Sequence, residues 1–367
     1  MRHAVLVTTI VFGGLHAAHA YPQYQLSRDQ TCTSCHQSPA GGGLLDENGL
    51  AVAESTSARS GSAGFLYGAI EPPGWLSLGG DLRGAAGVVN PGKLGAAAYP
   101  MQAEVYASAG GDGFTLELTG GLRSPQDSGS ALHVLWSREH YVMWRQHPGS
   151  PFGLYVRAGR FMPVFGLRLA EHVAYTQRYG GEPLFGEAYG AAIEYVAPMF
   201  ELHATGFVHD SIGSAVEHGD GGALYVERRL GAHAAIGAEA KYAASSEQHT
   251  TYGGVTGKLY IEGPDVLLQT EAEVIHQVIV SGGSGNALAG YLLATHTLTA
   301  GWLLDVGVGH YTENTSVAGL YRDCVDANVH WFTTPHLELL LTTRLELLDA
   351  GSGPTGGYAL VQLHYRL

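Results

Sequence analysis

The residues with the most specific chemistry in this sequence lie in the stretch TCTSCH, residues 31–36, which contains Cys32, Cys35 and His36. The pattern C-x-x-C-H is typical of the covalent attachment of haem c. Its spacing lets two thiols add to the two vinyl groups on one edge of the porphyrin, and the histidine that follows then lies under the iron. We therefore expect one covalent haem c, attached through Cys32 and Cys35, with His36 as the proximal axial ligand.

Three other uses of the motif fit the sequence less well. A structural zinc site would need four Cys or His ligands, and the sequence has no second C-x-x-C pair. A thioredoxin-like redox motif would need a surrounding βαβ pattern, which the flanking residues do not show. A plain disulfide between Cys32 and Cys35 would leave His36 without a role.

The sequence does not identify the ligand on the opposite side of the iron. Residues 21–70 contain no methionine, and His36 is their only histidine. A sixth ligand must therefore come from the rest of the chain, or the iron is five-coordinate. The candidates are Met143, Met162, His133, His140 and His172. The third cysteine, Cys324, stands alone, and the sequence leaves open whether it is a free thiol, an intermolecular link or a buried packing residue.

The first twenty residues, MRHAVLVTTIVFGGLHAAHA, have the layout of a secretory signal peptide. A short basic start precedes an apolar run and a small-x-small site at residues 18–20. The run is too short to span a membrane, which takes about 20 apolar residues. We therefore expect export, with residues 1–20 as the signal peptide and a mature chain that starts at Tyr21.

The composition indicates a protein that is neither an ordinary soluble domain nor a nucleic-acid binder. Charged residues make up 14% of the 367 residues, whereas soluble domains carry about 25%. The formal net charge of −14 argues against nucleic acid as a partner. No residues suggest a hydrolytic or transferase site, so the sequence leaves open whether the protein is an enzyme.

From residue 75 to residue 367 the sequence alternates between apolar and polar residues with the period of a β-strand. In FTLELTGGLR, for example, Phe114, Leu116 and Leu118 fall on one side and Thr115 and Glu117 on the other. The chain ends in such a strand, ALVQLHYRL, as outer-membrane proteins do. Sixteen candidate strands are found, near residues 75–89, 98–109, 112–124, 131–146, 153–162, 186–197, 199–209, 219–230, 232–243, 252–262, 265–278, 287–297, 300–311, 321–332, 335–348 and 356–366.

An even number of strands of about 10 residues, joined by short and longer connections in turn, predicts an all-β transmembrane antiparallel β-barrel. A soluble β-sandwich is the alternative, but one of nearly 300 residues would normally divide into domains. The expected organisation is a haem-binding segment (21–54), a linker (55–74) and the barrel (75–367). Its apolar row would face outer-membrane lipid and its polar row the interior.

Three details follow from this assignment. Strict alternation in strand 131–146 would send both Arg138 and His140 to the lipid, so we expect a bulge near Ser137. The connection from Pro163 to about Pro183 either folds into the pore or forms a solvated extracellular loop. The small N-terminal segment has too few large apolar residues for a core of its own, so we expect it to pack against or inside the barrel mouth, with a short helix over residues 46–54.

A short haem-binding N-terminus followed by a barrel of about sixteen strands resembles the fused outer-membrane monohaem cytochrome–porins known from iron-oxidising bacteria. The specific part of this resemblance is Cys32-x-x-Cys35-His36, with Pro39 just after it and Leu44 and Gly49 downstream. The resemblance implies electron transfer across the bacterial outer membrane. The partners would be an extracellular redox substrate, such as Fe(II), and a periplasmic cytochrome or other electron carrier.

Three functions are therefore weighed. The first is an outer-membrane electron conduit whose haem lies on the periplasmic side or in the barrel lumen. The second is a passive porin with a structural or gating haem plug. The third is a haem enzyme such as a peroxidase, although no distal His–Arg pair lies near the motif.

Overall fold

A computed structural model describes residues 24–27, 30–90, 95–122, 135–169, 173–183, 186–209, 219–348 and 356–367. The predicted signal peptide (1–20) and two of the candidate ligands, His133 and His172, lie outside the described residues.

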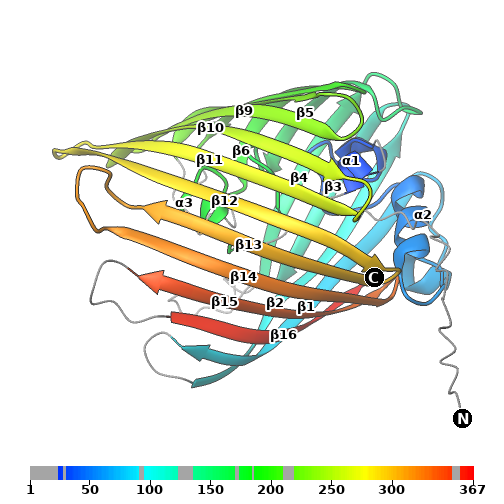
Figure 1. Cartoon of the computed structure of the whole chain (residues 1–367). Helices are drawn as coiled ribbons and strands as arrows, with labels where there is room; N and C mark the ends of the chain where they lie inside the picture. Colours follow the sequence, from blue (N-terminus) through cyan, green and yellow to red (C-terminus); the bar gives the residue numbers. More distant parts are fainter. Residues whose placement is uncertain are drawn as a thin grey trace, which may run out of the picture.

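In the described part of the chain, sixteen antiparallel strands form one closed barrel, in which each strand pairs with its neighbours in sequence and β1 pairs with β16 (Figure 1). All sixteen predicted strands are confirmed, with ends that move by a few residues. Their bounds are β1 Leu76–Asn90, β2 Gly95–Gly111, β3 Phe114–Leu122, β4 Leu135–Arg145, β5 Gly153–Phe161, β6 Ala188–Ala197, β7 Phe200–Val208, β8 Asp220–Arg229, β9 Ala234–Ala244, β10 Gln248–Ile261, β11 Val266–Ile279, β12 Ser284–Thr299, β13 Trp302–Thr312, β14 Tyr321–Thr334, β15 Leu337–Leu348 and β16 Gly356–Arg366.

The two faces of the wall follow the predicted alternation. On β16, Val361 and Leu363 are exposed on the outer face, whereas His364 is buried on the inner face. On β14, Val325 is exposed, and the flanking Cys324 and Asp326 are buried inside. An apolar outer row and a polar inner row are the pattern of a barrel whose outside meets lipid. Cys324 packs in an apolar cluster with Tyr175 and Tyr291, which fits the packing role.

The bulge predicted near Ser137 is confirmed. In the β3–β4 ladder Thr119 pairs with Glu139 and the next residue, Gly120, pairs with Ser137, so Arg138 is left unpaired between them. The extra residue lets the Arg138 side chain reach into the barrel, where its Nε lies 2.6 Å from Glu187. The bulge thus removes a charge from the outer face, where it would cost about 2–4 kcal/mol at mid-bilayer.

The connection between β5 and β6 folds into the lumen over its described residues 162–169, 173–183 and 186–187, which we call the inward loop. Its helix α3 (Tyr175–Tyr179) contacts β11, β12 and β13. Tyr175 Oη donates to Glu346 on β15 (2.8 Å), and Gly181 N donates to Glu273 on β11 (2.8 Å). Because of these contacts with the opposite wall, the loop lies in the pore and is not a solvated extracellular loop.

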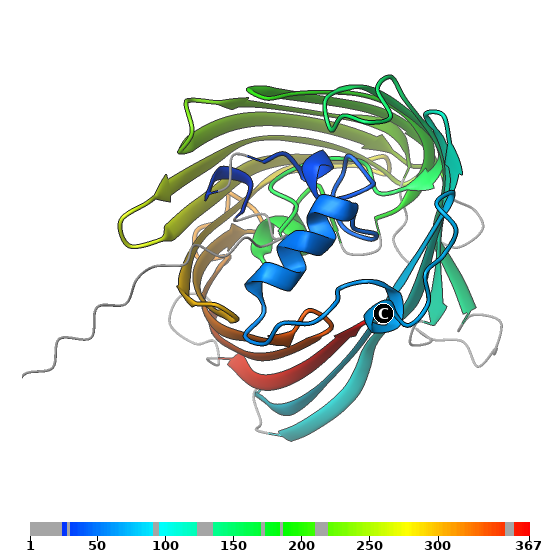
Figure 2. The same cartoon turned by 90° about the vertical axis from the view of Figure 1, so that its right-hand side faces the viewer.

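The described N-terminal residues 24–27 and 30–63, which we call the plug, lie in the mouth of the barrel at the end where the chain makes tight turns such as 300–301 and 335–336. They contain α1 (Tyr24–Ser27), a 3₁₀ turn (Cys32–Ser34) and α2 (Glu47–Thr56). Figure 2, which looks into this end, shows α2 lying across the opening. None of the described helices is long and apolar enough to span a membrane.

Candidate functional site

The cysteine motif is held in a tight turn by its own backbone. Ser34 N donates to Thr31 O (3.0 Å) and Cys35 N to Cys32 O (3.2 Å), which forms the 3₁₀ turn, and His36 N also donates to Cys32 O (2.9 Å). A short antiparallel pairing then joins residues 35–37 to residues 44–46, since Asp46 N donates to Cys35 O and Gln37 N to Leu44 O. The chain reverses between them through Gly41, Gly42 and Gly43, all of which have positive φ. This places both sulfurs and the imidazole in one compact loop.

Helix α2 packs directly against this loop. Its N-cap is Asp46, whose Oδ1 accepts from Gly49 N (2.8 Å). Gly49 lies so close to the motif that an added Cβ would overlap the carbonyl oxygen of Cys35. The predicted short helix is confirmed, and it continues to Thr56, two residues into the predicted linker.

The motif presents two thiols that are not bonded to each other and a neutral imidazole, the groups that haem attachment would use. The structure has no bond between the two thiols, and burial raises the pKa of Cys35 to about 12. His36 Nδ1 lies 3.0 Å from Gly42 O. Burial lowers the pKa of His36 to about 4, so the ring is neutral and Nδ1–H donates, which leaves Nε2 with a free lone pair. Imidazoles that ligate metals are commonly oriented by such a bond from the other ring nitrogen.

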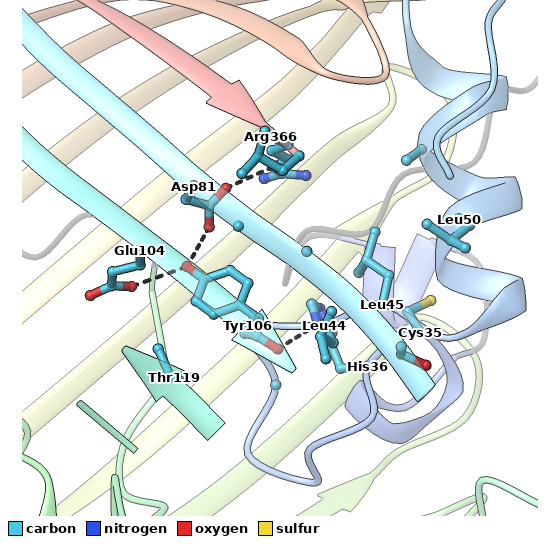
Figure 3. Close-up of a pocket in the computed structure, with 18 of the residues that line it drawn as sticks. Cys35, His36, Leu44, Leu45, Leu50, Asp81, Glu104, Tyr106, Thr119 and Arg366 are labelled. Atoms are coloured by element: carbon cyan, nitrogen blue, oxygen red, sulfur yellow. Dashed lines mark hydrogen bonds and ion pairs between the residues drawn. The ribbon is translucent and has the colours of Figure 1, made fainter. Parts of the chain in front are cut away.

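The motif faces a cavity of about 1200 Å³ inside the barrel, bounded by the plug on one side and by the inward loop on the other. Typical ligand pockets measure about 300–1,000 Å³, so the volume is large enough for a bulky cofactor. Figure 3 shows the plug side, where Leu44, Leu45 and Leu50 lie beside Cys35 and His36. The facing wall is polar, with Asp81, Tyr106, Glu104 and Arg366.

The structure places the described candidate distal ligands in three different surroundings. Met162 lines the cavity. Met143 is buried in a cluster with Tyr141 and Tyr155, away from the cavity wall. His140 points to the outer face of the barrel, where its ring nitrogens lie 2.8 Å from Ser137 Oγ and 2.9 Å from Tyr189 Oη. Of these three, Met162 alone shares the cavity with His36.

A further methionine, Met101, also lines the cavity and was missed by the sequence analysis. The β1–β2 ladder pairs Arg83 with Gln102 and then Gly84 with Pro100, so Met101 is the unpaired residue of a bulge. Bulges redirect side chains, and strand alternation cannot anticipate them. The usable signal was Pro100, because proline inside a strand often marks a bulge.

Hydrogen bonds tie the plug to the barrel wall at several points. Thr33 Oγ1 donates to Pro151 O (2.7 Å) in the β4–β5 turn, and Gly301 N donates to Thr56 O (2.7 Å). Gln25 Nε2 donates to Glu201 (3.1 Å), and its Oε1 accepts from Lys258 Nζ (2.6 Å). The expected packing of the N-terminal segment in the barrel mouth is therefore observed.

Behind the motif, a buried ionic network connects plug, wall and inward loop. Arg157 on β5 makes a two-pronged ion pair with Glu194 on β6 (2.8 and 2.9 Å), and both side chains are fully buried. His203 bridges Glu194 and Glu201 (3.2 and 3.4 Å). Arg168 of the inward loop completes the network, with one nitrogen 3.3 Å from Glu201 and another 3.4 Å from the Pro39 carbonyl of the plug.

A second series of hydrogen-bonded polar side chains extends from the cavity around the inner wall. Asp81 accepts from Tyr106 Oη (2.7 Å) and lies 2.7 Å from His364. Glu338 bridges His364 and His330 (2.9 and 2.7 Å), and His330 lies 2.9 Å from Asp305. The series alternates carboxylates with imidazoles, so each carboxylate has a hydrogen-bonding partner across the strand interface.

Comparison with known proteins supports the fold. No protein-family model matches the sequence, and no curated protein does. Among solved structures, the chain is similar to a loop L8 deletion mutant of OmpT, an outer membrane protein of Vibrio cholerae (TM-score 0.60, 15% identity, 80% of this chain and 99% of that chain). It is also similar to an anion-selective porin from Comamonas acidovorans (TM-score 0.60, 14% identity, 80% of this chain and 99% of that chain).

Salmonella typhi OmpF, solved with daunomycin, is a third similar structure (TM-score 0.59, 10% identity, 80% of this chain and 97% of that chain). Likenesses at this level of identity bear on the fold alone. The chain therefore has the closed sixteen-stranded antiparallel barrel fold of outer-membrane porins.

Proposed function

We propose that the protein is a bacterial outer-membrane barrel of the porin type whose plug carries one haem c and passes electrons between a periplasmic carrier and an extracellular redox substrate. The observation that carries this proposal is the position of the motif. Cys32, Cys35 and His36 lie in a plug that is bonded into the barrel mouth and faces an internal cavity. The barrel fold supports the membrane location, because its outer row is apolar along strand after strand.

The residues around the motif fit the cofactor. Each thiol would add across one vinyl group, with its hydrogen transferred to the vinyl carbon, and His36 Nε2 would face the iron. Haem c, when bound, supplies a centre that takes up and releases one electron. The apolar plug residues Leu44, Leu45 and Leu50 would limit the access of water to it, and the hydrophobic surroundings of a haem are one determinant of its potential.

The test distinguishes a loss of covalent haem from a failure of the barrel to assemble. Cys35→Ala should abolish covalent haem, seen by haem staining of a denaturing gel and in the visible spectrum, and should stop electron exchange in outer-membrane vesicles. The barrel should still assemble, as judged by the heat-dependent gel mobility of folded barrels. Cys324→Ala, a change to the third cysteine, is the matched control and should retain haem. Undiminished electron exchange in haem-free vesicles would contradict the proposal.

A passive porin is the second candidate, and the fold favours it because the similar solved structures include an anion-selective porin and an outer membrane channel. In that case the plug would be a structural or gating element. Single-channel conductance in planar bilayers separates the two functions. A conduit should conduct ions poorly while the plug is in place and much better after deletion of residues 24–63, whereas a large conductance of the intact, haem-loaded protein would favour the porin.

A further inference from the structure

Two arginines lie on the cavity wall where the first and last strands of the barrel meet. Arg83 on β1 and Arg366 on β16, which we call the seam arginines, both line the cavity that the cysteine motif faces. In the β1–β16 ladder Arg83 lies opposite His364, which is buried on the inner face. Arg366 lies two residues beyond His364 on the same strand. Both arginine side chains therefore belong to the inner wall.

The neighbouring groups leave the positive charge of the seam arginines only partly compensated. Asp81 already has close partners in Tyr106 Oη (2.7 Å) and His364 (2.7 Å). Its distance from Arg366 Nε is 3.9 Å, which is too long for a hydrogen bond. Arg83 Nε is buried and has no hydrogen-bond partner among the described residues. A buried donor without a partner is costly, so Arg83 is suited to an anion that the protein itself does not supply.

The seam arginines differ in this respect from the other cations of the cavity. Each of the others has a carboxylate partner within 3.3 Å: Arg138 with Glu187 and Glu104, Arg168 with Glu201, and Lys258 with Glu227. No ion pair of this kind joins Arg83 to a carboxylate in the described part of the chain. The wall at the seam is therefore where the cavity can best accept negative charge.

The expected attachment of the haem directs its acidic edge toward this wall. Haem carries its two vinyl groups on one edge of the porphyrin and its two propionates on the opposite edge. If Cys32 and Cys35 hold the vinyl edge in the plug, the propionates would point away from the plug. Figure 3 shows Arg366 on the polar wall that faces the plug. Burial lowers the pKa of His36, and the charge of Arg366 lowers it further, so this arginine acts on the imidazole that would ligate the iron.

We propose that Arg83 and Arg366 bind the propionates of the haem. This inference rests on the proposed function, because it requires haem c in the plug. A guanidinium group can donate two parallel hydrogen bonds to one carboxylate. A carboxylate tethered through the porphyrin also has a high effective concentration at the wall, so it would occupy the site ahead of free anions. The seam arginines are positioning residues that orient the haem and raise its reduction potential, because nearby positive charge favours the reduced iron.

The experiment compares haem-loaded wild type and Arg83→Gln, both purified in detergent. It measures the resonance Raman bending modes of the propionates and the midpoint potential in a spectroelectrochemical titration. In Arg83→Gln the propionate modes should move toward those of free haem in water, and the midpoint potential should fall. Arg83→Lys retains the charge and should restore most of the potential. The amount of covalent haem should be the same in all three proteins, because the cysteines are unchanged.

The matched control removes the same charge elsewhere. Arg228 is an exposed arginine of β8 that does not line the cavity, so Arg228→Gln should alter neither quantity. A fall in potential equal to that of Arg83→Gln would show an effect of total charge and would contradict the proposal. Arg366→Gln is the second variant, and it should lower the potential in the same direction even if Arg83→Gln fails to assemble.

Three results would overturn the assignment of the propionates. The first is a wild type whose propionate modes equal those of free haem in water, a measurement that needs no variant. The second is an unchanged spectrum and potential in haem-loaded Arg83→Gln, which would leave the proposed function standing. The third is a spectral response of the wild type to inorganic phosphate that Arg83→Gln lacks, because the site would then take free anions. A wild type without covalent haem on a stained gel would instead contradict the proposed function itself.

Discussion

The wall and the plug are built on different principles. The wall repeats one rule, an apolar residue outside and a polar residue inside, across sixteen strands, and each strand is held by two neighbours. The plug has no such repeat, and its position depends on single contacts such as Thr33 to Pro151 and Gln25 to Glu201. We therefore infer that the wall controls whether the barrel forms, whereas the plug controls how the cysteine motif is positioned. Substitutions in the two regions should therefore affect different measurements.

The largest effect is expected where the wall contains a buried charge. Arg157→Met removes the arginine that pairs with Glu194, and both side chains are fully buried, so the carboxylate keeps only its contact with His203. We expect a loss of about 3–5 kcal/mol in the free energy of unfolding, measured by urea titration in detergent micelles. The double variant Arg157→Met/Glu194→Leu should recover most of the loss, and a failure to recover would show that the pair is not the cause.

A charge on the outer face should have the next largest effect. Leu341 lies near the middle of β15 and is 45% exposed. Leu341→Arg should cost about 2–4 kcal/mol if this position lies at mid-bilayer depth, measured as unfolding from lipid vesicles. Leu341→Ala is the control and should cost much less. Equal stability of the two variants would contradict the lipid contact of this face.

In the plug, Gly49→Ala should separate assembly of the site from folding of the wall. The added Cβ would overlap the Cys35 carbonyl, and such overpacking costs about 1–3 kcal/mol. We expect less covalent haem per barrel, measured by the ratio of haem absorbance to protein, with an unchanged urea midpoint for the barrel. Ala51→Ser, at an exposed position of α2, should have neither effect. A lower urea midpoint for Gly49→Ala would show that the two regions are coupled.

The smallest effect is expected at the start of α2. Asp46→Ala removes the N-cap that accepts from Gly49 N, a change that typically costs about 1 kcal/mol of helix stability. Amide hydrogen exchange in α2 should accelerate, while exchange in the strands stays the same. Asp46→Asn retains a capping oxygen and should restore slow exchange, and no change in either variant would show that wall contacts alone hold α2.

The sequence predicted the wall well because its signal is repeated. In a single segment, the apolar row of Phe114, Leu116 and Leu118 already indicates a β-strand. Sixteen such segments together leave few possible folds. Cys32, Cys35 and His36 lie within five residues of one another, so their spacing is visible in the sequence, and the haem that it predicts stays a prediction. Even the bulge at Arg138 could be predicted, because strict alternation would have placed a charge in lipid.

Features that depend on non-local register could not be predicted. Glu239 on β9 and Glu273 on β11 both pair with Gly254 on the strand between them, and no local pattern identifies which inner residues meet in this way. Met101 was not predicted to line the cavity because a bulge breaks the alternation on which the prediction relied. Strict alternation placed His140 on the outer face, and it lies there, because the bulge turns Arg138 inward and leaves His140 outside.

The pairing of β1 with β16 has a consequence for folding kinetics. The hydrogen bond between Asp81 and His364 joins residues 283 positions apart, whereas turns such as 198–199 and 300–301 join adjacent strands directly. Contacts between residues so distant in sequence form slowly, so the seam between the first and last strands should be the last part of the barrel to form. Because residues 64–75 connect the plug to the start of β1, the plug is tethered to one edge of this seam.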